Sequence, residues 1–283
     1  MTQELVGIIG GTGLGDALAA QLTDVQQREV QTPFGEPSGP ITIGTLGSRQ
    51  VAFLGRHGPG HALGPSEVPF AANIFALKKL GVRAVIASGA VGSLRDEIAP
   101  GGLVIVDQFI DKTFKRTNTF FADYAAVHCE MAQPTCSRLR QTLLRAANPM
   151  DVNIHPRGTY VCMEGPQFST RAESLMHRAW GGDLIGMTAM PEAKLAREAQ
   201  MCYALVALAS DYDCWRPHDP AKGQQTLLQE ILANVEAATQ NCLGLIEALL
   251  ASDEPLACGD CACRHSLELA VWTDPKRSDP ARK

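Results

Sequence analysis

Short apolar runs alternate along this chain with segments of helical spacing, and this alternation limits the folds that the chain can adopt. Residues 6–9, 84–88 and 103–106 have the length and composition of buried strands. Residues 71–80 and 225–250 instead place apolar side chains three or four positions apart, which predicts helices. Such alternation favours an α/β fold with a largely parallel sheet. The other expected elements are a hairpin over 41–54 and helices over 135–147, 171–180 and 191–201.

The composition of the chain excludes several classes of protein. The chain has 283 residues, of which 45% are hydrophobic and 19% are charged, and its formal net charge is −5. The negative charge argues against a dedicated nucleic-acid surface. No apolar run approaches the roughly 18 residues of a membrane-spanning helix, and residues 1–5 lack the pattern of a secretory signal. These features favour a cytoplasmic enzyme.

The simplest division of the chain is one domain over residues 4–250 and a tail over residues 251–283. A chain of this length can bury a large core in a single domain. After Ala251 the composition becomes polar, with prolines and paired charges. We expect the end of this tail, from Asp274, to be disordered.

Two carboxylates, Asp211 and Asp213, follow the apolar run 206–209 with one tyrosine between them. Side chains two positions apart in an extended segment point to the same side. Both carboxylates can therefore face one cavity at the carboxyl end of a strand, where open α/β sheets bind ligands. Two acceptors in that arrangement suit a ligand edge rich in N–H donors, such as the amino and ring-nitrogen edge of adenine.

Four loops that follow apolar runs carry groups suited to anions or hydroxyls. They span residues 10–13, 56–58, 89–93 and 186–192. Glycine-rich backbone can present N–H groups to a phosphate, and arginine is the natural two-pronged partner of phosphate oxygens. Taken singly, each loop also fits an ordinary role: a tight turn, a solvated Arg-His pair, a packing turn or a helix start. A nicotinamide-binding fingerprint is disfavoured because Asp16 stands where its third glycine belongs.

Taken together, these segments resemble the family of trimeric purine nucleoside phosphorylases, and most closely its members that cleave S-methyl-5′-thioadenosine. The resemblance spans nearly all of residues 6–250. It is carried by residues 7–14, 32–35, 56–58, 72–78, 92–95, 107–111, 164–169, 187–188 and 211–215.

The resemblance implies a single α/β domain with a central mixed, partly barrel-like sheet flanked by helices. It implies a homotrimer, with a hexamer left open, and the reversible phosphorolysis of S-methyl-5′-thioadenosine to adenine and 5-methylthioribose 1-phosphate, a salvage reaction. Inorganic phosphate is then a co-substrate, and neither a cofactor nor a metal is expected.

The resemblance also assigns roles to individual residues. The phosphate would be held by Thr12, Arg56, His57 and Thr188 and by the backbone at Ala90. The nucleoside would be held by Phe168, Met187, Asp211, Asp213, Leu227 and Leu228, and by His128 from a neighbouring subunit. Asp211 would be the general acid that protonates the leaving purine, which requires a raised pKa beside Asp213.

Substrate choice follows from two positions of this chain. Relatives that cleave 6-oxopurine nucleosides carry glutamate where Ser169 stands and asparagine where Asp211 stands. The alternative function is a purine nucleoside or methylthioinosine phosphorylase, and Ser169 and Asp211 argue against it. Two departures from the relatives are visible: Gly186 replaces an asparagine near the base, and Gly89 replaces a threonine that touches phosphate.

The tail contains a cysteine cluster whose role stays open. Cys258, Cys261, Cys263 and His265 have side chains that suit zinc, but redox chemistry and an inert tail are alternatives, as is a regulatory protein acting through this cluster. The resemblance adds that Cys136 and Cys202 match positions that form a disulfide in heat-stable relatives.

Overall fold

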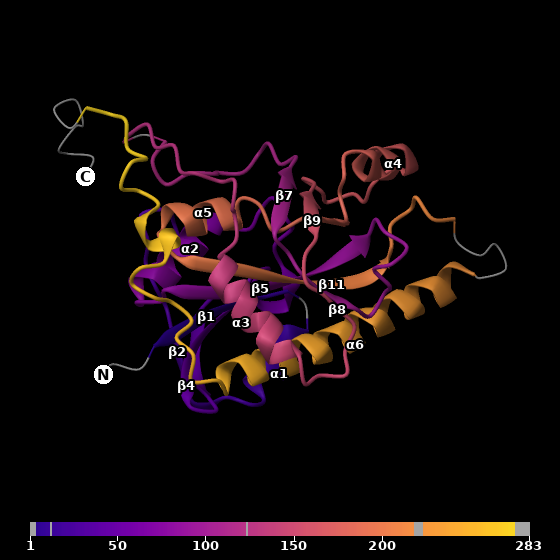
Figure 1. Ribbon diagram of the computed structural model, residues 1–283, viewed down its shortest axis with the longest axis horizontal. Helices are drawn as coiled ribbons and strands as arrows, with labels where there is room; N and C mark the ends of the chain where they lie inside the picture. Colours follow the sequence, from indigo (N-terminus) through magenta and orange to yellow (C-terminus); the bar gives the residue numbers. More distant parts are fainter. Residues whose placement is uncertain (1–3, 12, 123, 218–222, 275–283) are drawn as a thin grey trace.

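Four parallel strands form the centre of the computed structural model, which describes residues 4–11, 13–122, 124–217 and 223–274 (Figure 1). In spatial order they are β4 (Arg49–Gly55), β1 (Leu5–Gly10), β5 (Ala84–Ser93) and β11 (Cys202–Tyr212). Because parallel strands point the same way, the carboxyl ends of all four lie at one edge of the sheet. The predicted polar loops at 10–13 and 56–58 begin at that edge. Residues 89–93, predicted as a loop, are instead the carboxyl half of β5, and the loop at 186–192 follows β10 (Leu184–Gly186), which is antiparallel to β5.

The rest of the eleven-stranded sheet is mixed rather than largely parallel. Strands β2 (Thr23–Arg28) and β3 (Ile41–Leu46) extend it as antiparallel neighbours beside β4. β5 contacts three strands, since its carboxyl half also pairs antiparallel with β10. The sheet therefore branches at β5, which agrees with a mixed sheet. The remaining strands are β6 (Leu103–Ile105), β7 (Gln108–Asp111), β8 (Ile154–His155), β9 (Thr159–Cys162) and β10 (Leu184–Gly186).

Helices cover both faces of the sheet, and each face has its own apolar core. α2 (Phe70–Lys79) and α5 (Glu192–Glu198) pack on one face. α1 (Leu14–Ala19), α3 (Ser137–Ala147) and α6 (Gln224–Leu250) pack on the other face, and Figure 1 shows the two groups on opposite sides. α4 (Arg171–Ala179) lies beyond the edge of the central strands. Short 3₁₀ turns span Pro59–His61 and Ala262–His265.

The helices and strands expected from apolar spacing are present, with ends shifted by a few residues. The sequence analysis named no element at α1, β2, β7, β8, β9 or β10. β2 is exposed along its whole length and has a polar sequence, so it carries no apolar pattern that could reveal it. Among the described residues, no helix combines the length and apolar character needed to cross a membrane.

The described part of the tail packs on the domain instead of extending from it. Leu256 and Ala270 are buried, and Val271 pairs with Val127 as an antiparallel bridge. Arg49 fixes the start of the tail by donating hydrogen bonds to the carbonyls of Leu250 and of two later residues. The predicted disorder from Asp274 onward falls on residues 275–283, outside the described chain.

Candidate active site

Three polar loops meet at the carboxyl edge of the central strands, and Arg56 lies at their centre. Its backbone N–H donates to the carbonyl of Gly10 at the end of β1. Its side chain is only 1% exposed, and Nη1 donates to the carbonyl of Ser88 in β5 at 2.7 Å. Arg56 therefore joins the ends of β4 and β1 to the middle of β5.

Glu192 neutralises Arg56 in the interior. Its two carboxylate oxygens accept hydrogen bonds from Nε and Nη2 of Arg56 at 2.8 and 3.0 Å, and one of them also accepts from the Tyr203 hydroxyl at 2.9 Å. Burial opposes the charged form of Arg56, but its attraction and hydrogen bonds to Glu192 raise its pKa above the usual value. Arg56 therefore stays cationic at any pH at which the protein is folded.

A small hollow of backbone faces the remaining side of this guanidinium. A Cβ added at Gly11 or at Gly89 would lie 3.9 Å from Arg56 Nη1, and one at Gly89 would lie 3.4 Å from Thr188 Oγ1. Arg56, Thr188 and the two glycines thus lie around one point, and Ala90, an exposed residue, follows Gly89 directly. This arrangement suits a phosphate. Thr12, which was predicted to bind phosphate, lies outside the described residues.

His57 borders a cavity of about 420 Å³ that also includes Gly11 and Arg56. Its Nδ1 lies 2.9 Å from the carbonyl oxygen of Leu63, and because a carbonyl can only accept, Nδ1 carries the proton. Burial lowers the pKa of His57, and the charge of Arg56 lowers it further. A neutral His57 therefore presents Nε2 as an acceptor, which suits the protonated oxygen of a phosphate monoanion.

The two carboxylates lie farther along the same edge. Asp211 pairs with Gly92 across β11 and β5, next to a bulge at Ser210. The Ser210 hydroxyl lies 2.6 Å from Asp211 Oδ1 and 3.1 Å from the carbonyl of Val91. Asp213 is buried, and within the described chain its Oδ2 has no hydrogen-bond partner. A buried carboxylate oxygen without a donor is costly, so Asp213 is suited to a ligand that brings one.

β5 relates the anion hollow to the carboxylates. The hollow is at Gly89, and Asp211 pairs with Gly92, three residues later on the same strand. At about 3.3 Å per residue the two regions are roughly 10 Å apart. That separation matches the span from a phosphate beneath a ribose to the far edge of a purine.

The loop that carries Phe168 lies beside these carboxylates. The Cys214 thiol donates to the carbonyl of Ser169 at 3.3 Å, which fixes the loop next to Asp213. Phe168 itself is 87% exposed, and it is therefore accessible to a ligand. Met187 packs on the start of the same loop, since a Cβ at Gly165 would meet its sulfur at 2.6 Å.

Tyr160 occupies the space that a side chain at position 186 would need. A Cβ added at Gly186 would lie 2.0 Å from the Tyr160 hydroxyl oxygen. That hydroxyl accepts a hydrogen bond from the backbone N–H of Thr188 at 3.3 Å. In some relatives an asparagine stands at this position. Here the space beside Gly186 is occupied by Tyr160 of β9, and the Tyr160 hydroxyl contacts the Thr188 backbone.

Arg116 is a second buried cation that the sequence analysis missed. It donates to the carbonyls of Met187 and Met190, both at 2.6 Å, and to the carboxylate of Glu164. Burial would raise the pKa of Glu164, but hydrogen bonds from Ser66 and nearby backbone N–H groups, together with Arg116, lower it to about 2. Arg116 fixes the carbonyl of Met187, the residue predicted to contact the ribose.

The remaining predicted residues lie on α6 and in the segment before α3, and α6 reaches this edge where the Asn234 side chain donates to the carbonyl of Ser210 at 3.0 Å. Leu227 is half-buried and Leu228 is 57% exposed at the start of α6, which extends away from the body in Figure 1. His128 contacts the tail, where its N–H donates to the carbonyl of Ala270 and its ring packs on Trp272. The described contacts of His128 therefore leave its predicted role at a neighbouring subunit's site open.

Comparison with known proteins gives consistent matches over nearly the whole chain. The model of the phosphorylase superfamily matches residues 5–251. The S-methyl-5′-thioadenosine phosphorylase of Gloeobacter violaceus is 45% identical, with coverage of 99% of this chain and 93% of the relative. The enzyme of that name from Koribacter versatilis is 46% identical, with coverage of 96% and 90%.

Solved structures agree with these matches. A methylthioadenosine phosphorylase from an Antarctic soil metagenomic library superimposes with a TM-score of 0.86 at 44% identity, covering 99% of this chain and 96% of that one. The methylthioadenosine phosphorylase of Schistosoma mansoni in complex with adenine gives a TM-score of 0.81 at 36% identity, covering 88% and 91%.

Removal of the Glu192 carboxylate is expected to destabilise the protein strongly. Glu192→Ala leaves Arg56 as an uncompensated buried charge, and breaking such a pair costs about 3–5 kcal/mol. Urea denaturation measures the loss. Arg145→Ala, which breaks the exposed pair with Glu254, is the control and should change the midpoint little. Equal effects of the two variants would contradict the importance given to the buried pair.

The contact between Gly186 and Tyr160 predicts non-additive substitutions. Gly186→Ala should cost about 1–3 kcal/mol of stability, because the new methyl group collides with the phenol. Tyr160→Leu removes the colliding atoms, so the double variant should be destabilised by less than the two single changes together. A denaturation cycle measures this coupling. Gly259→Ala is the control, because a Cβ there meets nothing within 4 Å; additive effects would refute the contact.

Proposed function

The chain belongs to the phosphorylase superfamily, and we propose that it transfers the methylthioribosyl group of S-methyl-5′-thioadenosine to inorganic phosphate. The products are adenine and 5-methylthioribose 1-phosphate, the reaction is reversible, and phosphate is a co-substrate with no cofactor required. The names of the Gloeobacter and Koribacter relatives support this assignment. A solved S. mansoni relative, in a variant form, is in complex with methylthioadenosine.

The proposal rests on two features of one site: a hollow beside the Arg56 guanidinium, and a buried Asp213 carboxylate oxygen that lacks a hydrogen-bond donor. Asp213 Oδ2 is buried and has no partner among the described residues, whereas the hollow at Gly89 and Thr188 faces Arg56. The 6-amino group of adenine would supply the donor that Asp213 lacks, and phosphate would fill the hollow. A nucleoside would then span the roughly 10 Å between them.

The chemistry at the hollow follows from charge. Arg56 and the Thr188 hydroxyl would hold phosphate beneath the anomeric carbon, with Thr12, His57 and the backbone of Ala90 contributing. Breaking the glycosidic bond builds positive charge on the ribose, which a phosphate anion stabilises before it attacks the same carbon. Since Arg56 is already neutralised by Glu192, the hollow would bind the anion without trapping it as a permanent ion pair.

Asp211 is proposed as the acid that protonates the leaving purine. Its Oδ1 faces the Ser210 hydroxyl, which has a single proton and two neighbouring acceptors, Asp211 and the carbonyl of Val91. The Ser210 hydroxyl donates to Asp211 Oδ1 and so orients the carboxyl group. The proton delivered to the purine N7 would then be on the other oxygen of Asp211, in a carboxyl group kept neutral beside Asp213.

Specificity for a 6-amino purine is proposed from Ser169 and Asp211. Ser169 lies beside Cys214 through the hydrogen bond of its carbonyl, so its side chain belongs to the same end of the site as the carboxylates. A hydroxyl there leaves no carboxylate to bind the N1–H of a 6-oxopurine, and an ionised carboxylate at Asp211 would accept from an amino group but repel a 6-oxo group. The alternative, a phosphorylase of 6-oxopurine nucleosides, is therefore less favoured.

A homotrimer is proposed because the family resemblance assigns His128 to the site of a neighbouring subunit. Leu227 and Leu228 would contact the methylthio group, with Phe168 on the purine face and Met187 against the ribose. His128 lies with the tail of its own chain, so its contribution would go to the neighbouring subunit. Exposed Leu228 and Leu232 on α6 are suited to such a contact, and sedimentation of the active enzyme tests it.

Incubation with methylthioadenosine should release adenine only when phosphate is present.

Asp211→Asn should lower kcat by about 10²–10⁴-fold, the usual contribution of a general acid, because the amide cannot deliver the proton. Chromatography of adenine and of the sugar phosphate measures both effects. Asp151→Asn, at an exposed position, is the matched control. Release without phosphate would indicate a hydrolase, and full turnover by Asp211→Asn would exclude the acid role.

The ratio of kcat/KM for methylthioadenosine to that for inosine tests the specificity. The unmodified protein should strongly prefer methylthioadenosine. The double variant Ser169→Glu with Asp211→Asn should shift the ratio toward inosine, because glutamate can accept from N1–H and asparagine can donate to a 6-oxopurine. Comparable rates with both nucleosides in the unmodified protein would overturn the assignment.

A further inference from the structure

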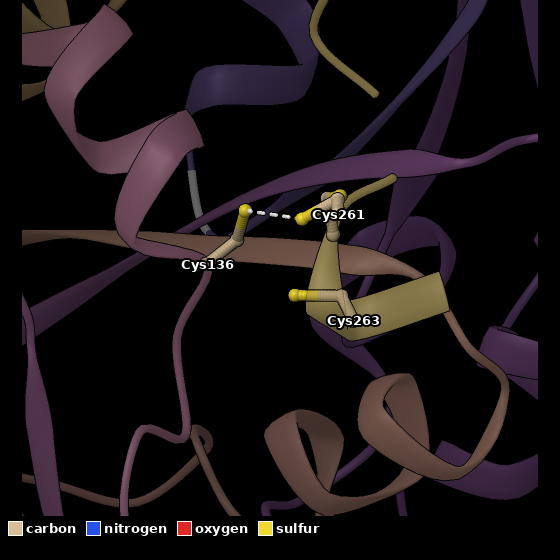
Figure 2. A group of neighbouring side chains, drawn as sticks. Cys136, Cys261 and Cys263 are labelled. Atoms are coloured by element: carbon tan, nitrogen blue, oxygen red, sulfur yellow. Dashed lines mark hydrogen bonds between the residues drawn. The ribbon is translucent and has the colours of Figure 1, made fainter. Parts of the chain in front are cut away.

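Four cysteine sulfurs meet at the end of β11 opposite the carboxylates. Cys202 is the first residue of β11, Cys136 caps the amino end of α3, and Cys261 and Cys263 come from the 3₁₀ turn in the tail. All four sulfurs lie within 4.8 Å of one another. Figure 2 shows the sulfurs of Cys136, Cys261 and Cys263 turned toward a common space.

The spacing of these sulfurs matches a metal site better than a disulfide. Cys261 Sγ lies 3.6 Å from Cys136 Sγ and 3.6 Å from Cys202 Sγ. Tetrahedral zinc with bonds of about 2.3 Å places its sulfur ligands about 3.8 Å apart. A disulfide instead needs one pair at about 2.05 Å, and here no pair is singled out and every thiol is free.

An N–H donor and two guanidinium groups lie beside the four sulfurs. Cys136 Sγ accepts from the N–H of Leu139 at 3.5 Å, at the positive end of α3. Arg138 interacts electrostatically with Cys258, Cys136, Cys202 and Cys261, and its Nε and Nη2 are buried without a partner in the described chain. Arg197 acts in the same way on Cys263. Two guanidinium groups balance the charge of −2 that four thiolates and one zinc ion carry.

Three of the four sulfur-bearing residues lie in the protein interior, and Cys261 is half-buried. Cys136, Cys202 and Cys263 are buried at 2%, 0% and 5% exposure. A site closed in this way has the character of a structural metal site, which keeps no open position for substrate.

We propose that Cys136, Cys202, Cys261 and Cys263 bind one zinc ion as a tetrahedral thiolate site that holds the tail on the domain. Zinc displaces the thiol protons to solvent, and no oxidation is involved. The ligand set differs from the one that the tail sequence suggested. Cys258 lies outside the four-sulfur group, and His265 bonds to Glu268 and to the carbonyl of Gly259.

The site would act on the part of the tail that follows it. Beyond Cys263, Val271 pairs with Val127, and the carbonyl of Ala270 and the ring of Trp272 contact His128. Zinc would therefore fix the segment that carries His128. The zinc proposal does not depend on the catalytic role of His128, because it is tested by metal content.

Metal analysis of the full-length protein, purified under reducing conditions without chelator, should find about one zinc per chain. The double variant Cys261→Ser with Cys263→Ser should lose that zinc and become cleavable by protease within the tail. Cys258→Ser, three residues before Cys261 but outside the sulfur group, is the matched control and should keep the zinc. Cobalt added to metal-free protein should give the visible bands of tetrahedral thiolate coordination in the control and none in the double variant.

Several results would overturn the proposal. One is the absence of zinc together with no cobalt spectrum in the reduced protein. Another is fewer than nine reactive thiols in the unreduced, denatured protein, since its nine cysteines would then include disulfides. Stoichiometric iron in place of zinc would also exclude the assignment, as would zinc that remains in the double variant.

Discussion

The buried pair of Arg56 and Glu192 is the interaction on which the rest of this edge of the sheet depends. A guanidinium with 1% exposure is tolerable only because two of its nitrogens meet one carboxylate and a third meets a carbonyl. Glu192 in turn is held by Tyr203 of β11. The pair therefore couples β4, β5, α5 and β11, and it leaves one side of a permanent cation facing a backbone hollow.

β5 carries this arrangement from one end of the candidate site to the other. Gly89 has no side chain that would fill the hollow. Gly92 allows Asp213 to approach the strand, since a Cβ added at Gly92 would lie 3.2 Å from Asp213 Cβ. The bulge at Ser210 then turns the end of β11. As a result the Ser210 hydroxyl reaches both the Asp211 carboxylate and the carbonyl of Val91. Small residues on one strand and an irregularity on its neighbour set the spacing that a nucleoside needs.

The sequence revealed the polar loops but not the contacts that give them their shape. Loops after apolar runs, and the carboxylates two residues apart, follow from local patterns. The partner of Arg56 could not be found in this way, because Glu192 lies 136 positions away and reads locally as the start of a helix. Tyr160 was missed for the same reason: only the fold places its hydroxyl in the space beside Gly186.

The tail illustrates the same limit at the opposite end of β11. Locally, Cys258, Cys261, Cys263 and His265 compose a plausible ligand run, yet a run of nearby residues cannot surround an ion without support from the core. The structure provides that support through Cys136 and Cys202, 125 and 59 positions from Cys261. Because Cys202 begins the strand whose last residues include Asp211, one strand joins the two regions. A metal bound there would fix the tail without competing for any group that a nucleoside requires.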